Sequence, residues 1–385
     1  GRVIDAVRAV EAAGFTSRAD FYHALQACFV NRPEQRAVFA QIFRLYWRDP
    51  RYMEHMMSLM LPSIRGTQEE KAAQAAGIGL TLLPVLYQWG GCDARPLGDG
   101  QRRFGSTPDS FARLHEGAAR HLSAHGHADD RIGVAPHSLR AVDGAGMAAA
   151  LALAADGPIH MHLAEQVAEV EEVEAHTGAR PVPWLLDNHE VDARWCLIHC
   201  TQMTPDETTR LAATGAVAGL CPITESNLGD GIFDGVRYLY AGGRAGVGSD
   251  SNVHIALFDE LRTLEYSQRL RDRSRAALAT PEASTGRRLF DMALAGGAQA
   301  GGRDAGRIAP GAWADLVALD TDNEWLCNRT GDTALDTAIF GGHGQACITD
   351  VWSSGRHVVQ QGRHIHRDAI RARFRAAMAA LERAS

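Results

Sequence analysis

The strongest constraint on the fold is a series of six short apolar segments, separated by stretches in which apolar residues recur at helical spacing. Most of these segments are apolar without interruption, which is typical of strands buried on both faces of a parallel sheet. Alternating strands and helices therefore predict an α/β fold in which helices cover a parallel sheet. The segments are residues 77–87, 131–138, 158–166, 195–201, 216–222 and 245–252.

Four segments carry a polar residue near the C-terminal end, and these residues are His137, His162, His199 and Asp250. One histidine in an apolar strand is more often a hydrogen-bonded core residue than a metal ligand. Four strand ends together favour a site, because parallel strands place their C-terminal ends on one face. His160 shares a strand face with His162, and Glu165 follows where strand gives way to loop. A metal ligand beside a carboxylate proton carrier suits hydrolysis by an activated water.

Length, charge and cysteine content limit the functional classes. The 385 residues suffice for a large domain and a smaller module. A net charge of -7 and the lack of Lys/Arg runs argue against nucleic acid and anionic membranes as partners. No apolar run approaches the roughly 20 residues of a membrane helix. The 7 cysteines form no CxxC pair, so we expect reduced thiols and a cytoplasmic protein. The expected partner is a small-molecule substrate, and a homodimer is left open.

The two ends of the chain differ from its middle in their pattern of apolar and turn-forming residues. Residues 1–70 show apolar residues three and four apart, which predicts a helical segment. After about Gly301, turn and strand patterns predict a small β-module with a hairpin, and a last helix follows. The expected domains are thus a helical segment, an α/β domain, a β-module and a C-terminal helix. Their expected bounds are 1–70, 72–300, 301–366 and 367–385.

Three further patterns receive structural interpretations. The acidic stretch 166–177 is expected to be a helix with a solvated face. Cys196 and Cys200 are expected to pack in or beside a strand. His364 and His366 form a second His-x-His pair, but on a peripheral hairpin, where a solvated edge is expected rather than the functional metal.

The N-terminal segment resembles the helical region of the CoxE-like von Willebrand factor A family. The likeness rests on residues 21–25, 31–34, 38–39 and 42–50. In that family a von Willebrand A domain with an Asp-x-Ser-x-Ser metal site comes later. This chain has no such motif, so no function of that domain is carried over.

From Ala72 onward the chain resembles the formimidoylglutamate deiminase family of the amidohydrolase superfamily. The Pro-His-Ser-Leu-Arg segment distinguishes this family from guanine- and adenosine-type relatives. The resemblance implies a (β/α)8 barrel with a small β-sandwich built from both chain ends. It rests on residues 82–87, 135–140, 160–166, 198–201, 221–231 and 249–252.

The resemblance also implies a reaction and roles for residues. The family hydrolyses the formimino C=N of N-formimino-L-glutamate to N-formyl-L-glutamate and ammonia in histidine degradation, with one zinc ion activating the water. His162 is then a zinc ligand, and Asp250 is the last ligand and takes a proton from that water. Glu165 shuttles a proton to the departing nitrogen, and His199 lies near the water. His137 and Arg140 hold the substrate, with Arg140 pairing with a carboxylate.

The chain departs from the family at its first barrel strand, where a His-x-His pair supplies two zinc ligands. No such pair precedes Gly77, and six strands are expected instead of eight. The predicted fold is therefore a TIM-type barrel that lacks its first two strands. One alternative is a catalytically impaired fusion product that is at most a binding or structural protein. Another is a guanine- or adenosine-type deaminase; zinc content and substrate separate the three.

Overall fold

The computed structural model describes Ala73, residues 75–250 and residues 254–384. Contacts divide the chain into two compact units, residues 1–63 and 64–385, and the fold below is that of the second unit. The helical segment predicted for the first 70 residues and the end of the Ser249–Asn252 motif lie outside the described residues. The four predicted domain bounds stay predictions.

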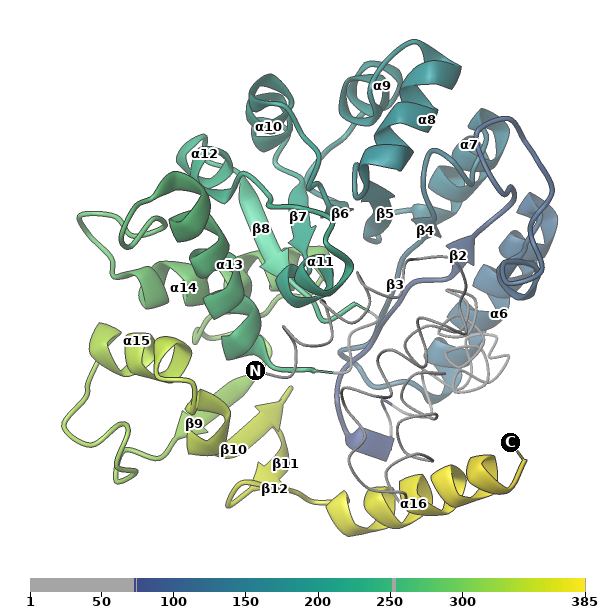
Figure 1. Ribbon diagram of the computed structural model, residues 1–385. Helices are drawn as coiled ribbons and strands as arrows, with labels where there is room; N and C mark the ends of the chain where they lie inside the picture. The colour runs from purple at the N-terminus through teal and green to yellow at the C-terminus, as the bar shows by residue number, and fades with distance from the viewer. Residues whose placement is uncertain (1–72, 74, 251–253, 385) are drawn as a thin grey trace, which may run out of the picture. The chain divides into compact units, whose positions relative to one another are not determined.

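Short parallel strands occupy six neighbouring positions (Figure 1). The first position holds β1 followed by β2, and the second holds β3 followed by β4. β1 pairs with β3, and β2 pairs with β4. A bridge between Val134 and Ile159 leads to β5, and β5, β6, β7 and β8 pair in that order. Among the described residues, no strand pairs with the outer edge of the first position or of β8. The strands are β1 (Thr81–Leu82), β2 (Val85–Leu86), β3 (Arg131–Ile132), β4 (Ala135–Pro136), β5 (Ile159–Leu163), β6 (Trp195–His199), β7 (Val217–Leu220) and β8 (Arg244–Val247).

The first two predicted segments form strands only in part. Pro84 has no N–H to give to a ladder, and it separates β1 from β2. At the second position, Val134 separates β3 from β4 and forms a parallel bridge with Ile159 of β5. Backbone hydrogen bonds nevertheless continue across the gap, from Gly133 N to Leu82 O and from Ala135 N to Pro84 O. The six predicted strand positions are therefore present, and the α/β fold of parallel strands is confirmed.

Helices follow the strands and lie outside them (Figure 1). In β5 the buried side chains alternate with His160 and His162, which confirms that the two histidines share a face. The buried set packs with helix side chains into one core. A Thr107 capping box begins the first of these helices. The helices are α6 (Pro108–His125), α7 (Gly144–Ala154), α8 (Val167–Thr177), α9 (Pro181–Asn188), α10 (Pro205–Ala212), α11 (Pro222–Leu228), α12 (Gly235–Tyr240), α13 (Leu257–Asp272) and α14 (Thr285–Ala300).

The C-terminal β-module is an antiparallel sheet in the order β12, β11, β10, β9. Two-residue turns at Ser354-Gly355 and Gln361-Gly362 connect its hairpins, and all four turn residues have positive φ, as tight hairpins require. The predicted hairpin is thus confirmed. Its elements are β9 (Leu316–Leu319), α15 (Asp332–Phe340), β10 (Ile348–Ser353), β11 (Arg356–Gln360) and β12 (Arg363–His364).

The predicted last helix is also present, as α16 (Arg367–Ala384). None of the helices within residues 73–384 is long and apolar enough to cross a membrane. A homodimer and a cytoplasmic location stay predictions.

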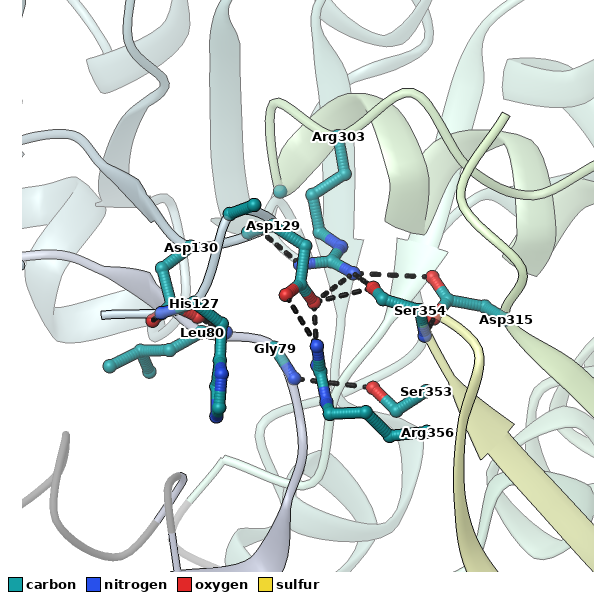
Figure 2. Close-up of polar contacts among 12 residues, drawn as sticks. Gly79, Leu80, His127, Asp129, Asp130, Arg303, Asp315, Ser353, Ser354 and Arg356 are labelled. Carbon is teal, nitrogen blue, oxygen red and sulfur yellow. Dashed lines mark hydrogen bonds and ion pairs between the residues drawn. The ribbon is translucent and has the colours of Figure 1, made fainter. Parts of the chain in front are cut away.

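Asp129 links the parallel strands to the β-module (Figure 2). It precedes β3, is 0% exposed, and accepts hydrogen bonds from Arg356 at 2.8 Å, Arg303 at 3.0 Å and Ser354. Burial by itself would raise the pKa of Asp129, but these donors outweigh burial and hold the pKa well below its usual range. Gly79 allows the close approach, because a Cβ there would meet Asp129 and Arg303. The module is therefore fastened to the strands by a buried charge cluster.

Candidate active site

The C-terminal strand ends bring the predicted site residues together. His137 follows β4, His162 lies near the end of β5, and His199 ends β6. Ring centroids are 4.7 Å apart for His137 and His162, and 5.7 Å apart for His162 and His199. Asp250 follows β8 and is near enough for its charge to act on His162 and His199. The clustering on one face agrees with the arrangement expected from the sequence.

His162 has the hydrogen bonding of a metal-binding histidine. Its Nδ1 lies 2.9 Å from the carbonyl oxygen of His137, which can only accept, so Nδ1 carries the proton. The lone pair of Nε2 is then available. Burial lowers the pKa of His162, which favours the neutral ring that metals bind. An imidazole held by a backbone carbonyl in this way is the usual support of a metal ligand.

The donors for a metal ion are incomplete in the described part of the chain. Zinc takes about four donors in tetrahedral geometry. His162 and the exposed carboxylate of Asp250 suit two of these positions. Within residues 75–250 and 254–384, no group of three or more His, Cys, Asp or Glu side chains is arranged to hold a metal. The described residues thus fit part of a zinc site and not the whole of it.

His199 lies between two carboxylates. Its side chain is 1% exposed, its Nε2 is 3.6 Å from Glu165 Oε1, and its Nδ1 is 3.4 Å from Glu225 Oε1. Burial opposes a charge on this ring, but the two carboxylates outweigh burial and raise the pKa of His199. Burial also raises the pKa of Glu165. Both shifts favour the protonated form, so the pair is suited to holding a proton. The sequence indicated Glu165 and His199 as site residues, but not Glu225.

The predicted acidic helix is α8, on which Glu171 and Glu174 are exposed as expected, but Glu169 is an exception. Its side chain is buried, with Oε1 3.2 Å from Ala164 N and Oε2 2.8 Å from Glu165 N. The carboxylate thus fixes the turn that carries Glu165. The sequence signal that could have identified Glu169 is its position in the first turn of a helix, where a carboxylate can accept hydrogen bonds from backbone N–H groups.

The predicted substrate-binding residues stand beside this cluster. Burial, with the charges of His162 and Arg140, lowers the pKa of His137 to about 3, so this ring is neutral at physiological pH. Its Nδ1 is 3.0 Å from Ser138 Oγ, and the Tyr87 ring meets it edge-on at 4.2 Å between centroids. The buried Nε of Arg140 has no hydrogen-bond partner among the described residues. Arg140 therefore has a donor to offer to an anionic ligand.

Asp230 is a further acid at the site that sequence reasoning missed. Burial raises its pKa, and its charge is close enough to His199 and Asp250 to interact with both. One carboxylate oxygen is buried without a partner in the described residues. Gln202 Nε2 donates to the backbone oxygens of Asp230 and Glu165, which ties the two loops together. Glycines on both sides, at positive φ, shape this loop.

Backbone conformations uncommon for non-glycine residues gather at the same strand ends. Ala164, His199, Cys200 and Asp250 have φ values of 51°, 72°, 53° and 48°. Such residues persist only where the surrounding structure holds them, and they concentrate at functional sites. Cys196 lies in β6 and Cys200 directly follows it; both are buried, as expected, and burial raises their thiol pKa values.

Sequence comparisons find two family matches and several relatives. The amidohydrolase family model matches residues 68–358, and the CoxE N-terminal helical bundle domain model matches residues 1–50. Formimidoylglutamate deiminase of Pseudomonas aeruginosa is 48% identical over 296 residues, which are 76% of this chain and 64% of that protein. A 5'-deoxyadenosine deaminase of Methanothermobacter thermautotrophicus is 33% identical over 58% of this chain and 53% of that protein. The chain thus spans less than two thirds of these curated relatives.

Solved structures show the same fold. An amidohydrolase from Brucella melitensis has a TM-score of 0.76 and 50% identity, covering 81% of this chain and 68% of its own. An adenosine deaminase from Xanthomonas campestris with bound zinc has a TM-score of 0.68 at 23% identity, covering 82% and 69%. Atrazine chlorohydrolase from Arthrobacter aurescens, complexed with zinc, has a TM-score of 0.64 at 22% identity, covering 77% and 64%.

Proposed function

This chain belongs to the amidohydrolase family, and from that premise we propose that it hydrolyses the formimino group of N-formimino-L-glutamate. The products are N-formyl-L-glutamate and ammonia. The observation that carries the proposal is the convergence of Glu165 and His199 beside His162, with Arg140 nearby offering a free donor. The 48% identity to a formimidoylglutamate deiminase supports this substrate over a purine nucleoside.

The reaction adds one water, and both of its protons are finally made good on the departing nitrogen. Water adds to the formimino carbon, and Asp250 receives its first proton. Glu165, whose pKa is raised by burial, delivers a proton to the terminal nitrogen. The carbon–nitrogen bond then breaks as the remaining hydroxyl proton follows to that nitrogen, which leaves as ammonia, and the proton on Asp250 passes to Glu165, so that both carboxyl groups are restored. His199, in which positive charge is favoured, stabilises the negative charge that develops on oxygen.

A divalent metal, zinc in this proposal, supplies positive charge that makes water a better nucleophile near neutral pH. His162 and Asp250 are the residues proposed to hold it, because one offers a free Nε2 and the other a carboxylate at a neighbouring strand end. The remaining donors of a site with about four positions come from outside this pair.

Arg140 and His137 are proposed to hold the glutamate part of the substrate. A guanidinium fork pairs with a carboxylate through parallel hydrogen bonds, and Arg140 has an unused Nε. His137 has a pKa of about 3 and so contributes a neutral hydrogen-bonding ring instead of a second cation. In this proposal neutral His137 makes a polar contact with the substrate, and charged Arg140 pairs with a substrate carboxylate.

The test measures zinc content and ammonia release on one sample of the full chain. We expect about one zinc per chain and ammonia from N-formimino-L-glutamate, with none from guanine or adenosine. His162→Ala should lose zinc, and His366→Ala on the peripheral hairpin should keep it. Little zinc and no ammonia would support the impaired fusion product, and ammonia from a purine would support another deaminase.

A further inference from the structure

We propose that Glu225 is a positioning residue that holds the His199 ring with its Nε2 atom directed at Glu165. The consequence for turnover rests on the proposed function, whereas the contacts belong to this chain whatever its substrate. Oε1 of Glu225 is 3.4 Å from Nδ1 of His199, on the opposite edge of the ring from Glu165.

The geometry fixes which nitrogen carries the proton. A carboxylate accepts hydrogen bonds, so the ring donates Nδ1–H to Glu225. When the ring is neutral, Nε2 then presents its lone pair toward Glu165, 3.6 Å away. An acid that orients a histidine from behind, without touching the substrate, is a general device in histidine-dependent catalysis.

Glu225 is itself held firmly. It is 5% exposed, and its Oε1 also accepts a hydrogen bond from Cys221 N at 3.1 Å. The adjacent Thr224 donates from Oγ1 to Ser249 O at 3.1 Å, next to Asp250. The start of α11 is thereby joined to the end of β8. A carboxylate held by the Cys221 N–H, on a helix that Thr224 anchors to Ser249, can set the direction of the His199 ring.

A purely structural role is the competing explanation, since Glu225 also satisfies the Cys221 N–H at the start of α11. Glu260 offers a matched control for that role. It is 2% exposed, and its Oε2 accepts from Ile223 N at 2.9 Å in the same helix. Among the described contacts, Glu260 has none with His199. Removing Glu260 therefore disturbs α11 without touching the imidazole.

The experiment reads the proton position in His199 by ¹⁵N NMR of histidine-labelled full chain, with the signal assigned by its loss in His199→Gln. The neutral ring of the parent should carry its proton on Nδ1. Glu225→Ala should show both tautomers, Glu225→Gln should retain the Nδ1–H form through its amide oxygen, and Glu260→Ala should match the parent. In turnover, Glu225→Ala should lower kcat by about 10–100-fold with KM within about threefold, and Glu225→Gln should lie above it.

Two results would overturn the inference. One is a parent ring protonated on Nε2, which needs no variant to fold. The other is a Glu260→Ala variant that scrambles the His199 tautomer as Glu225→Ala does, because the effect would then come from the helix. A parent that releases no ammonia while its ring follows the expected pattern would remove the proposed function and leave the positioning role standing.

Discussion

His137, His162 and His199 stand at neighbouring strand ends, yet their surroundings act on their pKa values in different directions. Burial lowers the pKa of His137 to about 3 and lowers that of His162, whereas two carboxylates outweigh burial and raise that of His199. Three similar side chains are thereby given separate chemical states. The neutral rings of His137 and His162 suit contact with substrate and metal, and the ring of His199 suits stabilisation of negative charge.

Glu165→Gln tests the proton carrier at this scale. The amide keeps the size of the side chain but has no proton to exchange, so kcat should fall by roughly 10²–10⁴-fold. The measurement is ammonia release by metal-loaded chain. Glu171→Gln, on the exposed side of α8, is the control and should be unchanged. A Glu165→Gln rate within about threefold of the parent would mean that another group carries the proton.

At the scale of elements, α14 packs unusually close to β8. Gly296 faces the strand, and a Cβ at this position would meet the carbonyl of Ala245 and the N–H of Gly246. The neighbouring Gly297 has nothing within 4 Å of an added Cβ and is exposed. Since β8 leads to Asp250, the helix also supports one side of the site.

Gly296→Ala should therefore destabilise the fold by about 1–3 kcal/mol, because the helix must move away from the strand backbone. Gly297→Ala is matched in chemistry and helix, and it should be neutral or stabilising by about 0.5–1 kcal/mol through helix propensity. Urea unfolding followed by circular dichroism measures both. Equal effects of the two substitutions would show that the close contact is not limiting.

At the scale of the second unit, the Asp129 cluster joins residues that lie far apart in the sequence (Figure 2). Asp129→Asn removes the charge partner of Arg356 and one of the two charge partners of Arg303, which keeps Asp315 at 3.3 Å, so the free energy of unfolding should fall by about 3 kcal/mol. Asp93→Asn removes an exposed ion pair, with a side chain 60% exposed, and should cost less than about 1 kcal/mol.

The loss of stability caused by Asp129→Asn should also depend on pH. The pKa of Asp129 is depressed in the folded chain, so its contribution is complete above the ordinary carboxyl pKa and is lost as pH falls through the folded value. The difference in unfolding free energy between parent and Asp129→Asn should thus be constant from about pH 5 to 8 and shrink below about pH 4. Thermal melts across this range measure it, and a difference that grows toward acid would contradict the sign.

The sequence by itself determined the elements and much of the site. The six strand positions and the hairpin between residues 351–359 and 362–366 follow from apolar periodicity and turn residues, which act over a few residues. His137, His162 and Asp250 were found because strand ends in a parallel sheet share one face.

Only the tertiary structure decided what Glu169, Glu225 and Asp129 do. In sequence each is one acid among many, and an exposed acid has the same local pattern as a buried one. Their partners are set by packing: Asp129 meets Arg303 across 174 residues, and Glu225 meets His199 across 26. Contacts of this kind depend on how separate elements settle against each other, which is a property of the whole fold and not of any short stretch.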